Sequence, residues 1–227
     1  MSSIKSNIGI FAAFAIISAW LICLLLLMSW EISLSSPLLY IMILVQMHLY
    51  TGLFITAHDA MHGTVANNST LNNVIGQVCT ILYACFPFKK LYTKHHEHHR
   101  HVHTEMDPDY HTGGFFTWYF NFIREYIIWW QIVLMAVIFN VLKLWVSELN
   151  LLLFWVLPSL LSTLQLFYFG TWLPHHGDHD NQYHSRTQDK NHLLAFLSCY
   201  FFGYHYEHHD SPGTPWWKLW KLKSSAR

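Results

Sequence analysis

Long stretches of the chain contain no Asp, Glu, Lys or Arg, and they alternate with short segments in which the charged residues gather. The uncharged stretches cover 8–30, 32–58, 126–142 and 149–177. A helix that crosses a bilayer needs about 20 mainly apolar residues, and Phe120, Phe122 and Trp145 extend the shorter third stretch. We therefore predict an all-α integral membrane fold with about four transmembrane helices, over 8–30, 36–58, 122–145 and 151–173.

The segments between these stretches divide the charges unequally. An even number of crossings puts both termini on one side, and that side then carries most of the basic residues: Lys5, Lys89, Lys90, Lys94, Arg100, Arg124, Lys218, Lys221, Lys223 and Arg227. The opposite side holds the turns with Glu31, Lys143 and Glu148. Because Lys and Arg accumulate on the cytoplasmic side, we predict an inner-membrane protein with both termini in the cytoplasm. The first stretch is longer than a signal-peptide core, so we expect a retained helix.

The apolar segment 71–88 allows two interpretations. As a fifth crossing, it would put a whole bilayer between the histidines on either side of it. We instead predict a helix that lies along the membrane interface or dips in and out, ended by Pro87. The motif Pro215-Trp216-Trp217 begins a tail rich in Trp and Lys, which is typical of an interfacial anchor.

Composition agrees with a single membrane domain over 1–227. Hydrophobic residues make up 53% of the chain and charged residues only 11%, against about 25% charged residues in soluble domains. The formal net charge is zero, and no basic stripe interleaves with aromatic residues, so nucleic acid is excluded as a partner. The cysteines lie in apolar segments without metal-site spacing, and we expect buried free thiols. They are Cys23, Cys79, Cys85 and Cys199.

Histidine is unusually common, with 18 residues against 13 Lys plus Arg. Half of the histidines form three boxes at the ends of apolar segments, and spacing of i, i+4 in the first box and i, i+3, i+4 in the other two places each set on one helical face. Eight candidate metal ligands result: His58, His62, His95, His98, His99, His205, His208 and His209. His96 is rotated by about 100° from His95 and leaves that face. Ordinary surface positions are expected for His103, His111 and His192.

A fourth source of imidazole follows the last apolar stretch. His175 comes closest to the predicted helix end, at the depth of His58, and we predict that it is the ninth ligand. His184 is the alternative for that position. His48 lies about 15 Å along the helix from His58, which is too deep for a ligand, so we expect a hydrogen bond between helices or a place in a cavity wall.

Nine imidazoles exceed what one metal ion binds. Structural zinc takes four ligands, often thiolates, and no cysteine lies near the boxes. Imidazole also suits iron, copper and nickel, but two ions with four or five imidazoles each keep positions open for oxygen, which favours non-haem iron and O₂. Because ligand histidines usually donate their second N–H to a carboxylate, we expect Asp59, Asp107 and Asp109 to orient them or to join as ligands. Glu97 and Glu207 either share this role or solvate a loop.

Five motifs carry a resemblance to a known family. They are HDAMHG at 58–63, KHHEHHRH at 94–101 followed by Asp107-Pro108-Asp109, FGTWLPH at 169–175, GYHYEHH at 203–209 and PWW at 215–217. The three histidine boxes resemble those of the membrane fatty-acid desaturase and hydroxylase superfamily, and the motifs at 169–175 and 215–217 resemble the bacterial β-carotene ketolases. Those relatives usually carry Arg where this chain has His176, and 179–186 is shorter than in them, which leaves the role of His184 open.

The resemblance implies a di-iron oxygenase with two iron ions per chain. Such an enzyme uses O₂ to convert the C4 and C4′ methylenes of β-carotene to ketones, giving echinenone and canthaxanthin. Two hydroxylations at one carbon would give a geminal diol that loses water. Electrons would come from a separate protein such as ferredoxin, because the chain has no flavin, haem or nucleotide motif. The apolar carotenoid would reach the site from the lipid bilayer, sideways between helices.

Other functions fit part of the pattern. A carotenoid hydroxylase, an alkane hydroxylase or a fatty-acid desaturase or hydroxylase would use the same metal site. A membrane metal transporter with His-rich loops is an alternative of a different class. Transporters place their sites near the bilayer midplane on broken helices, whereas these histidines gather where the apolar stretches end, which favours the enzyme.

Overall fold

The computed structural model describes residues 7–225, and within them every regular element is a helix. In chain order these are α1 (Ile8–Met28), α2 (Pro37–Met61), α3 (Ser69–Ala84), α4 (Phe88–His101), α5 (Phe115–Tyr126), α6 (Trp129–Leu142), α7 (Glu148–Leu151), η1 (Leu152–Val156), α8 (Leu157–Phe167), η2 (Tyr168–Trp172), α9 (Leu173–His175), α10 (His192–Cys199), α11 (His205–Asp210) and α12 (Trp216–Ser225). Lys5 and Arg227, which belong to the predicted basic side, lie outside the described residues. The prediction of an all-α fold is confirmed.

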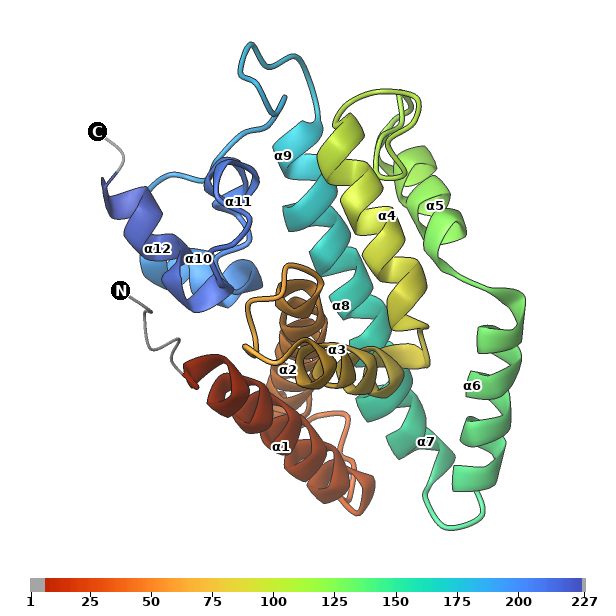
Figure 1. Cartoon of the computed structure of the whole chain (residues 1–227). Helices are drawn as coiled ribbons and strands as arrows, with labels where there is room; N and C mark the ends of the chain where they lie inside the picture. Colours follow the sequence, from red (N-terminus) through yellow and green to blue (C-terminus); the bar gives the residue numbers. More distant parts are fainter. Residues whose placement is uncertain (1–6, 226–227) are drawn as a thin grey trace.

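Three helices are long and apolar enough to cross a bilayer. They are α1, α2 and the continuous run Glu148–His175, in which the π-helical turns η1 and η2 join α7, α8 and α9. These helices match the predicted ones over 8–30, 36–58 and 151–173, and α2 continues past His58 to Met61. The central helix is α2, which packs against α1, α3 and α8 (Figure 1).

The predicted helix over 122–145 is not one helix. It is broken at Ile127 and Ile128, whose backbones are extended, and α5 and α6 meet there at 86°. The backbone carbonyls at the break accept hydrogen bonds from a side chain of α4. Lys90 Nζ donates to Tyr126 O at 2.9 Å and to Ile127 O at 3.3 Å. Gln131 Nε2 donates to Ala84 O at 2.5 Å. Long-range hydrogen bonds therefore stabilise a bend that local hydrophobicity does not indicate.

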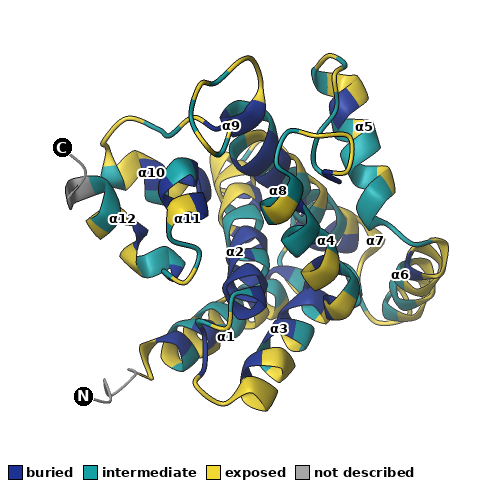
Figure 2. Cartoon of the chain, turned by 45° about the horizontal axis from the view of Figure 1, so that its top comes forward, coloured by how far each residue is buried: buried dark blue, intermediate teal, exposed yellow. Residues whose placement is uncertain are grey.

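The number of membrane crossings depends on whether two bent helix pairs, α3 with α4 and α5 with α6, each cross the bilayer. With 14 residues, α6 is about 21 Å long at 1.5 Å per residue, which is short of the roughly 30 Å of a bilayer core. The straight helices give three candidate spans, or up to five if each bent pair crosses. Figure 2 shows that much of α6 is exposed, and Gln131 is its buried residue.

The segment 71–88 contains a helix, α3, as predicted, but the helix ends at Ala84 and not at Pro87. Asn68 caps its start by accepting a hydrogen bond from the Leu71 N–H at 2.9 Å, and Cys85 ends it in the left-handed region at φ 57°. After Pro87 the chain turns by 101° into α4. The turn brings the second histidine box back towards the end of α2. The interfacial position of α3 stays a prediction.

The hydrophobic core lies between α2, α3, α8 and α10. Tyr50, Leu53, Tyr83 and Leu166 are buried in it, and it contains Cys79, one of four free cysteines. All four are free thiols, as predicted, but only Cys79 and Cys199 are buried, whereas Cys23 and Cys85 are partly exposed.

His48 does not make the predicted hydrogen bond between helices. Its ring stacks on Tyr200 at 4.3 Å and contacts Phe196 edge-on at 5.4 Å, while its Nε2 is buried without a partner. His48 therefore packs α2 against α10.

Candidate metal centre

Four helical segments bring the predicted histidines together. His58 lies in the last turn of α2 and His62 directly follows that helix, while the second box is on α4 and the third on α11. His175 is the last residue of α9. Although these positions span more than half of the sequence, α9, α4 and α11 lie near the same end of the bundle (Figure 1).

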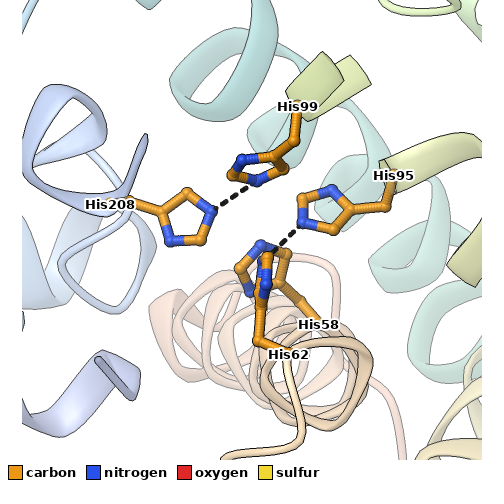
Figure 3. A group of neighbouring side chains, drawn as sticks. All are labelled: His58, His62, His95, His99 and His208. Carbon is orange, nitrogen blue, oxygen red and sulfur yellow. Dashed lines mark hydrogen bonds between the residues drawn. The ribbon is translucent and has the colours of Figure 1, made fainter. Parts of the chain in front are cut away.

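The nine histidines form two groups. The five-histidine group consists of His58, His62, His95, His99 and His208 (Figure 3). The four-histidine group consists of His98, His175, His205 and His209. In each group, one ring nitrogen of every histidine lies within 4.8 Å of those of the others.

The boxes on α4 and α11 are each divided between the two groups, although the members of each box lie on one helical face. On α4, His95 and His99 join one group and His98 joins the other. On α11, His205 and His209 join one group and His208 joins the other. Residues i and i+4 of each helix therefore stay together, while the residue at i+3 reaches across to the neighbouring group.

The nitrogen spacing fits metal ions. His62 Nε2 lies 2.7 Å from His95 Nε2, and His99 Nε2 lies 3.1 Å from His208 Nε2. In the other group, His205 Nε2 is 2.9 Å from the Nε2 atoms of both His175 and His209. A metal–nitrogen bond of about 2.1 Å puts two ligands at right angles about 3.0 Å apart. Each group thus has the geometry of imidazoles that share one ion.

Hydrogen bonds to Nδ1 fix the orientation of two ligand candidates. His98 Nδ1 lies 2.9 Å from Asp107 Oδ1, and the Asp107 carboxylate also accepts the backbone N–H groups of His103 and Asp109, each at 2.9 Å. His175 Nδ1 lies 2.9 Å from the carbonyl oxygen of His184. Both bonds hold the proton on Nδ1 and leave Nε2 free to bind metal.

The remaining predicted carboxylates support the site from a greater distance. Asp59 Oδ1 lies 3.5 Å from His58 Nδ1, and its Oδ2 accepts the Trp216 N–H at 2.9 Å. Asp109 Oδ2 lies 3.9 Å from His98 Nδ1, and its carboxylate accepts a hydrogen bond from the Tyr126 hydroxyl. Neither carboxylate belongs to a histidine group, and His58 Nδ1 is buried without a hydrogen-bond partner.

The His184 ring does not join either group. Its Nδ1 lies 3.1 Å from the carbonyl oxygen of His179, and the ring stacks on His103. His184 therefore acts through its backbone carbonyl, which leaves His175 as the ninth histidine. The ring of His96 also points elsewhere, with Nδ1 2.9 Å from Tyr92 O, as its helical position predicts.

The two glutamates have different surroundings. Glu207 accepts from Thr187 Oγ1 at 2.5 Å and pairs with Lys223 at 3.2 Å, so it fastens the third box to α12. Glu97 is partly exposed and lies 3.5 Å from Lys94. Among the described residues, neither glutamate side chain bonds to a histidine, which fits a structural role for Glu207 and a solvated one for Glu97.

Burial keeps the third box neutral. Desolvation, followed by the neighbouring imidazoles, holds the pKa values of His205, His208 and His209 well below the ordinary value of 6.5. Neutral imidazole is the form that binds metal. Burial raises the pKa of Asp109 to about 6. Burial also acts to raise the pKa of Asp107, but the hydrogen bond and charge of His98 and two backbone N–H bonds hold it below its ordinary value.

A cavity of about 550 Å³ borders both histidine groups. His58 and His95 of one group and His98 and His205 of the other are among the residues that line it. From there it runs between α8 and α6, along walls that are largely aliphatic and aromatic. The cavity and its walls were not predicted, because their residues lie within ordinary apolar segments of the sequence.

A second cleft approaches from a different side. It has a volume of about 1100 Å³ and lies between α3, α4 and the segment after α2. His62 and His96 line it together with amide side chains, among them Asn67, Asn73 and Gln77. The five-histidine group is therefore reached by an apolar cavity and by a polar cleft.

Comparison with known proteins agrees with this geometry. The family model "Fatty acid desaturase" matches residues 34–142 and 115–227. A "Beta-carotene ketolase" of Paracoccus sp. (strain N81106 / MBIC 01143) is 44% identical over 75% of this chain and 73% of its own length. Another of that name, from Paracoccus sp. (strain PC1), is 39% identical over 97% of this chain and 93% of its own length. A "Zeaxanthin 4-ketolase" of Chlamydomonas reinhardtii is 43% identical over 79% of this chain and 43% of its own length.

No solved structure matches the chain significantly. The family match extends over most of the sequence, from the second helix to the tail. The ketolase relatives cover the segments that supply both histidine groups. The chain therefore belongs to the fatty acid desaturase family and, within it, to the β-carotene ketolases, which are oxidoreductases.

Proposed function

We propose that this protein is a di-iron oxygenase that converts the C4 and C4′ methylenes of β-carotene to ketones, giving echinenone and canthaxanthin. The observation that carries the proposal is the pair of all-histidine groups that border an apolar cavity. An enzyme that oxidises a hydrocarbon methylene with O₂ needs both a metal centre and a site that excludes water. The named substrates of the ketolase relatives support the choice of carotenoid.

The five-histidine and four-histidine groups would each hold one iron ion. Their donors are imidazoles without thiolate, a set that suits iron, and the nitrogen spacing fits bonds of about 2.1 Å. When bound, the iron ions would supply the activation of O₂. Asp107 and the His184 carbonyl keep His98 and His175 turned towards the ions, and Asp59 and Asp109 support this arrangement.

The side chains of the cavity bind and orient the substrate. No charged group is needed for a hydrocarbon ring, and apolar walls from α6 and α8 exclude water around it. Holding one ring carbon beside the metal centre speeds the oxidation, because well-positioned reactants react several orders of magnitude faster than free ones. The same carbon is hydroxylated twice, and the resulting geminal diol loses water to give the ketone.

Each hydroxylation consumes one O₂, two electrons and two protons and releases one water. The apolar cavity is a poor route for protons, whereas the polar cleft with its amide side chains reaches His62 directly. We assign proton supply and water release to that cleft. The electrons come from a separate reductant such as a ferredoxin.

The chain acts as a single domain over 1–227 in the cytoplasmic membrane, with both termini and the metal centre on the cytoplasmic side. Its three long apolar helices support a bilayer setting. So does the outer surface of α1, where Phe11, Phe14 and Leu26 are about 70% exposed (71%, 70% and 70%). An aqueous surface rarely carries so many large apolar side chains. The carotenoid enters from the lipid, beside α6.

Pigment analysis in cells that make β-carotene tests this function. Expression of the chain is expected to yield echinenone and canthaxanthin, while zeaxanthin or unsaturated acyl chains would refute ketolation. His98→Ala and His208→Ala remove one imidazole from each group and are expected to abolish the ketones. His111→Ala is the matched control, because His111 belongs to neither group. Full activity in either of the first two variants would contradict the ligand assignment.

A further inference from the structure

One aromatic ring forms the wall of the cavity next to both histidine groups. Phe202 lines the cavity and is 7% exposed. Its ring centroid lies 4.7 Å from His58 and 5.4 Å from His208 of the five-histidine group, and 5.5 Å from His205 of the four-histidine group. A substrate ring that reaches the metal end of the cavity therefore has Phe202 beside it.

An unusual turn places this ring. Tyr200 and Phe201 both lie in the left-handed region, at φ 49° and 64°, although neither is glycine. Such residues carry backbone strain. The Phe202 N–H donates to Cys199 O at 2.8 Å and closes the turn. The neighbouring Phe201 packs away from the metal centre, against Tyr204 and Trp216.

The space for Phe202 depends on a glycine that its ring packs against. Gly170 belongs to η2 and also lines the cavity. A Cβ atom at Gly170 would lie 2.7 Å from Cε1 and 2.9 Å from Cδ1 of Phe202. Those distances are too short for carbon atoms, so any larger residue at position 170 would displace the Phe202 ring.

We propose that Phe202, packed against Gly170, is the surface that holds C4 of the substrate ring at the metal centre through both oxidation steps and keeps C3 away from it. This inference rests on the function proposed above. Neighbouring ring carbons are only about 1.5 Å apart. C4 is allylic and has the weaker C–H bonds, but a hydrocarbon ring offers no polar group to fix its register, so shape contact must decide which of the two carbons lies nearer the metal centre. Phe202 contacts the substrate, while Gly170 is a positioning residue that acts through Phe202.

The test compares four proteins in β-carotene-producing cells and as purified, iron-loaded enzymes. They are the wild type, Phe202→Leu, Gly170→Ala and the double variant. The products are separated into 4-ketone, 4-hydroxyl and 3-hydroxyl carotenoids, and iron per chain is measured for each protein. Phe201→Leu is the control, since it makes the same substitution on the same turn, outside the cavity lining.

We expect the wild type and Phe201→Leu to accumulate the ketone. Phe202→Leu and Gly170→Ala should raise the ratio of hydroxylated products to ketone at least about tenfold, which is the usual effect of a changed apolar contact on selectivity. Iron content should not change. The smaller Leu leaves room for a methyl group, so Gly170→Ala should add little to the effect of Phe202→Leu in the double variant.

Several results would overturn the inference. An unchanged product ratio in Phe202→Leu, with iron retained and ketone still formed, would reduce Phe202 to a packing residue. Independent, multiplicative effects of the two substitutions would show that Gly170 does not act through Phe202. A wild type that forms no ketone would overturn the proposed function itself and this inference with it, a result distinct from the other two.

Discussion

Asp107→Asn tests how the four-histidine group is held. Asp107 is buried, and its two oxygens accept from His98 Nδ1 and from two backbone N–H groups, all at 2.9 Å. Asparagine has nearly the same shape but provides only one acceptor oxygen. If that oxygen stays on His98, the amide group faces the His103 N–H, and two donors then oppose each other. The substitution therefore perturbs the support of His98 without removing a candidate ligand.

The expected loss follows from these contacts. An unsatisfied, partly buried N–H costs about 1–3 kcal/mol, and a bond to a neutral oxygen is about half as strong as one to a carboxylate. Together they weaken the bound orientation of His98 by roughly 1.5–3 kcal/mol, which corresponds to about tenfold to a hundredfold in metal affinity. The five-histidine group does not contain His98 and should keep its affinity.

Iron content after equilibration with graded chelator measures this effect. Compared with the wild type, Asp107→Asn should lose one of its two ions at a chelator concentration about tenfold to a hundredfold lower, while the other ion is lost at an unchanged concentration. Glu97→Gln is the matched control, since it neutralises a partly exposed carboxylate next to His98 on α4. Equal loss of both ions from Asp107→Asn, or no loss at all, would refute the division into two groups.

Three further predictions follow. His175→Ala should lower iron binding to about one ion per chain, while His184→Ala should keep two, because only the His184 carbonyl contacts the site; reversed iron counts would reverse the assignment. In the metal-free protein, the buried histidines of the third box bind fewer protons below pH 6.5 than they do in the unfolded state, so the melting temperature should fall as pH decreases through about 6.5. Asp109, with its pKa raised to about 6, acts in the opposite direction but does not reverse this fall. A melting temperature that rises in that range would contradict buried neutral imidazoles. Lys90→Met removes the donor to Tyr126 O and Ile127 O and should speed hydrogen exchange in α6 with little change in α2; unchanged exchange in α6 would show that Lys90 does not hold the bend.

The sequence was sufficient to predict the histidines that come together. Spacing of i, i+3 and i+4 puts imidazoles on one helical face whatever the helix packs against. The boxes that begin at His58, His95 and His205 could therefore be predicted from local sequence spacing alone. His175 was predicted from its place at the end of an apolar stretch. The same reasoning kept His96 out of the site, and its ring bonds to Tyr92 O instead.

The division of the histidines into two groups could not be predicted. It depends on how α4 and α11 are rotated against each other, and local spacing carries no information about that rotation. The bend at Ile127 was also missed, because it is stabilised by Lys90 and Gln131, which bond across 36 and 47 residues of sequence. Phe202 and Gly170 are apolar or small residues in apolar segments, and only their contact in space gives them a role.

X-ray absorption at the iron edge of the purified, iron-loaded protein tests the central claim most directly. Two sites of five and four imidazoles predict about two iron ions per chain, each surrounded by nitrogen or oxygen at about 2.1 Å, with the outer-shell scattering of imidazole rings. A single iron per chain, or a first shell that contains sulfur, would contradict the account.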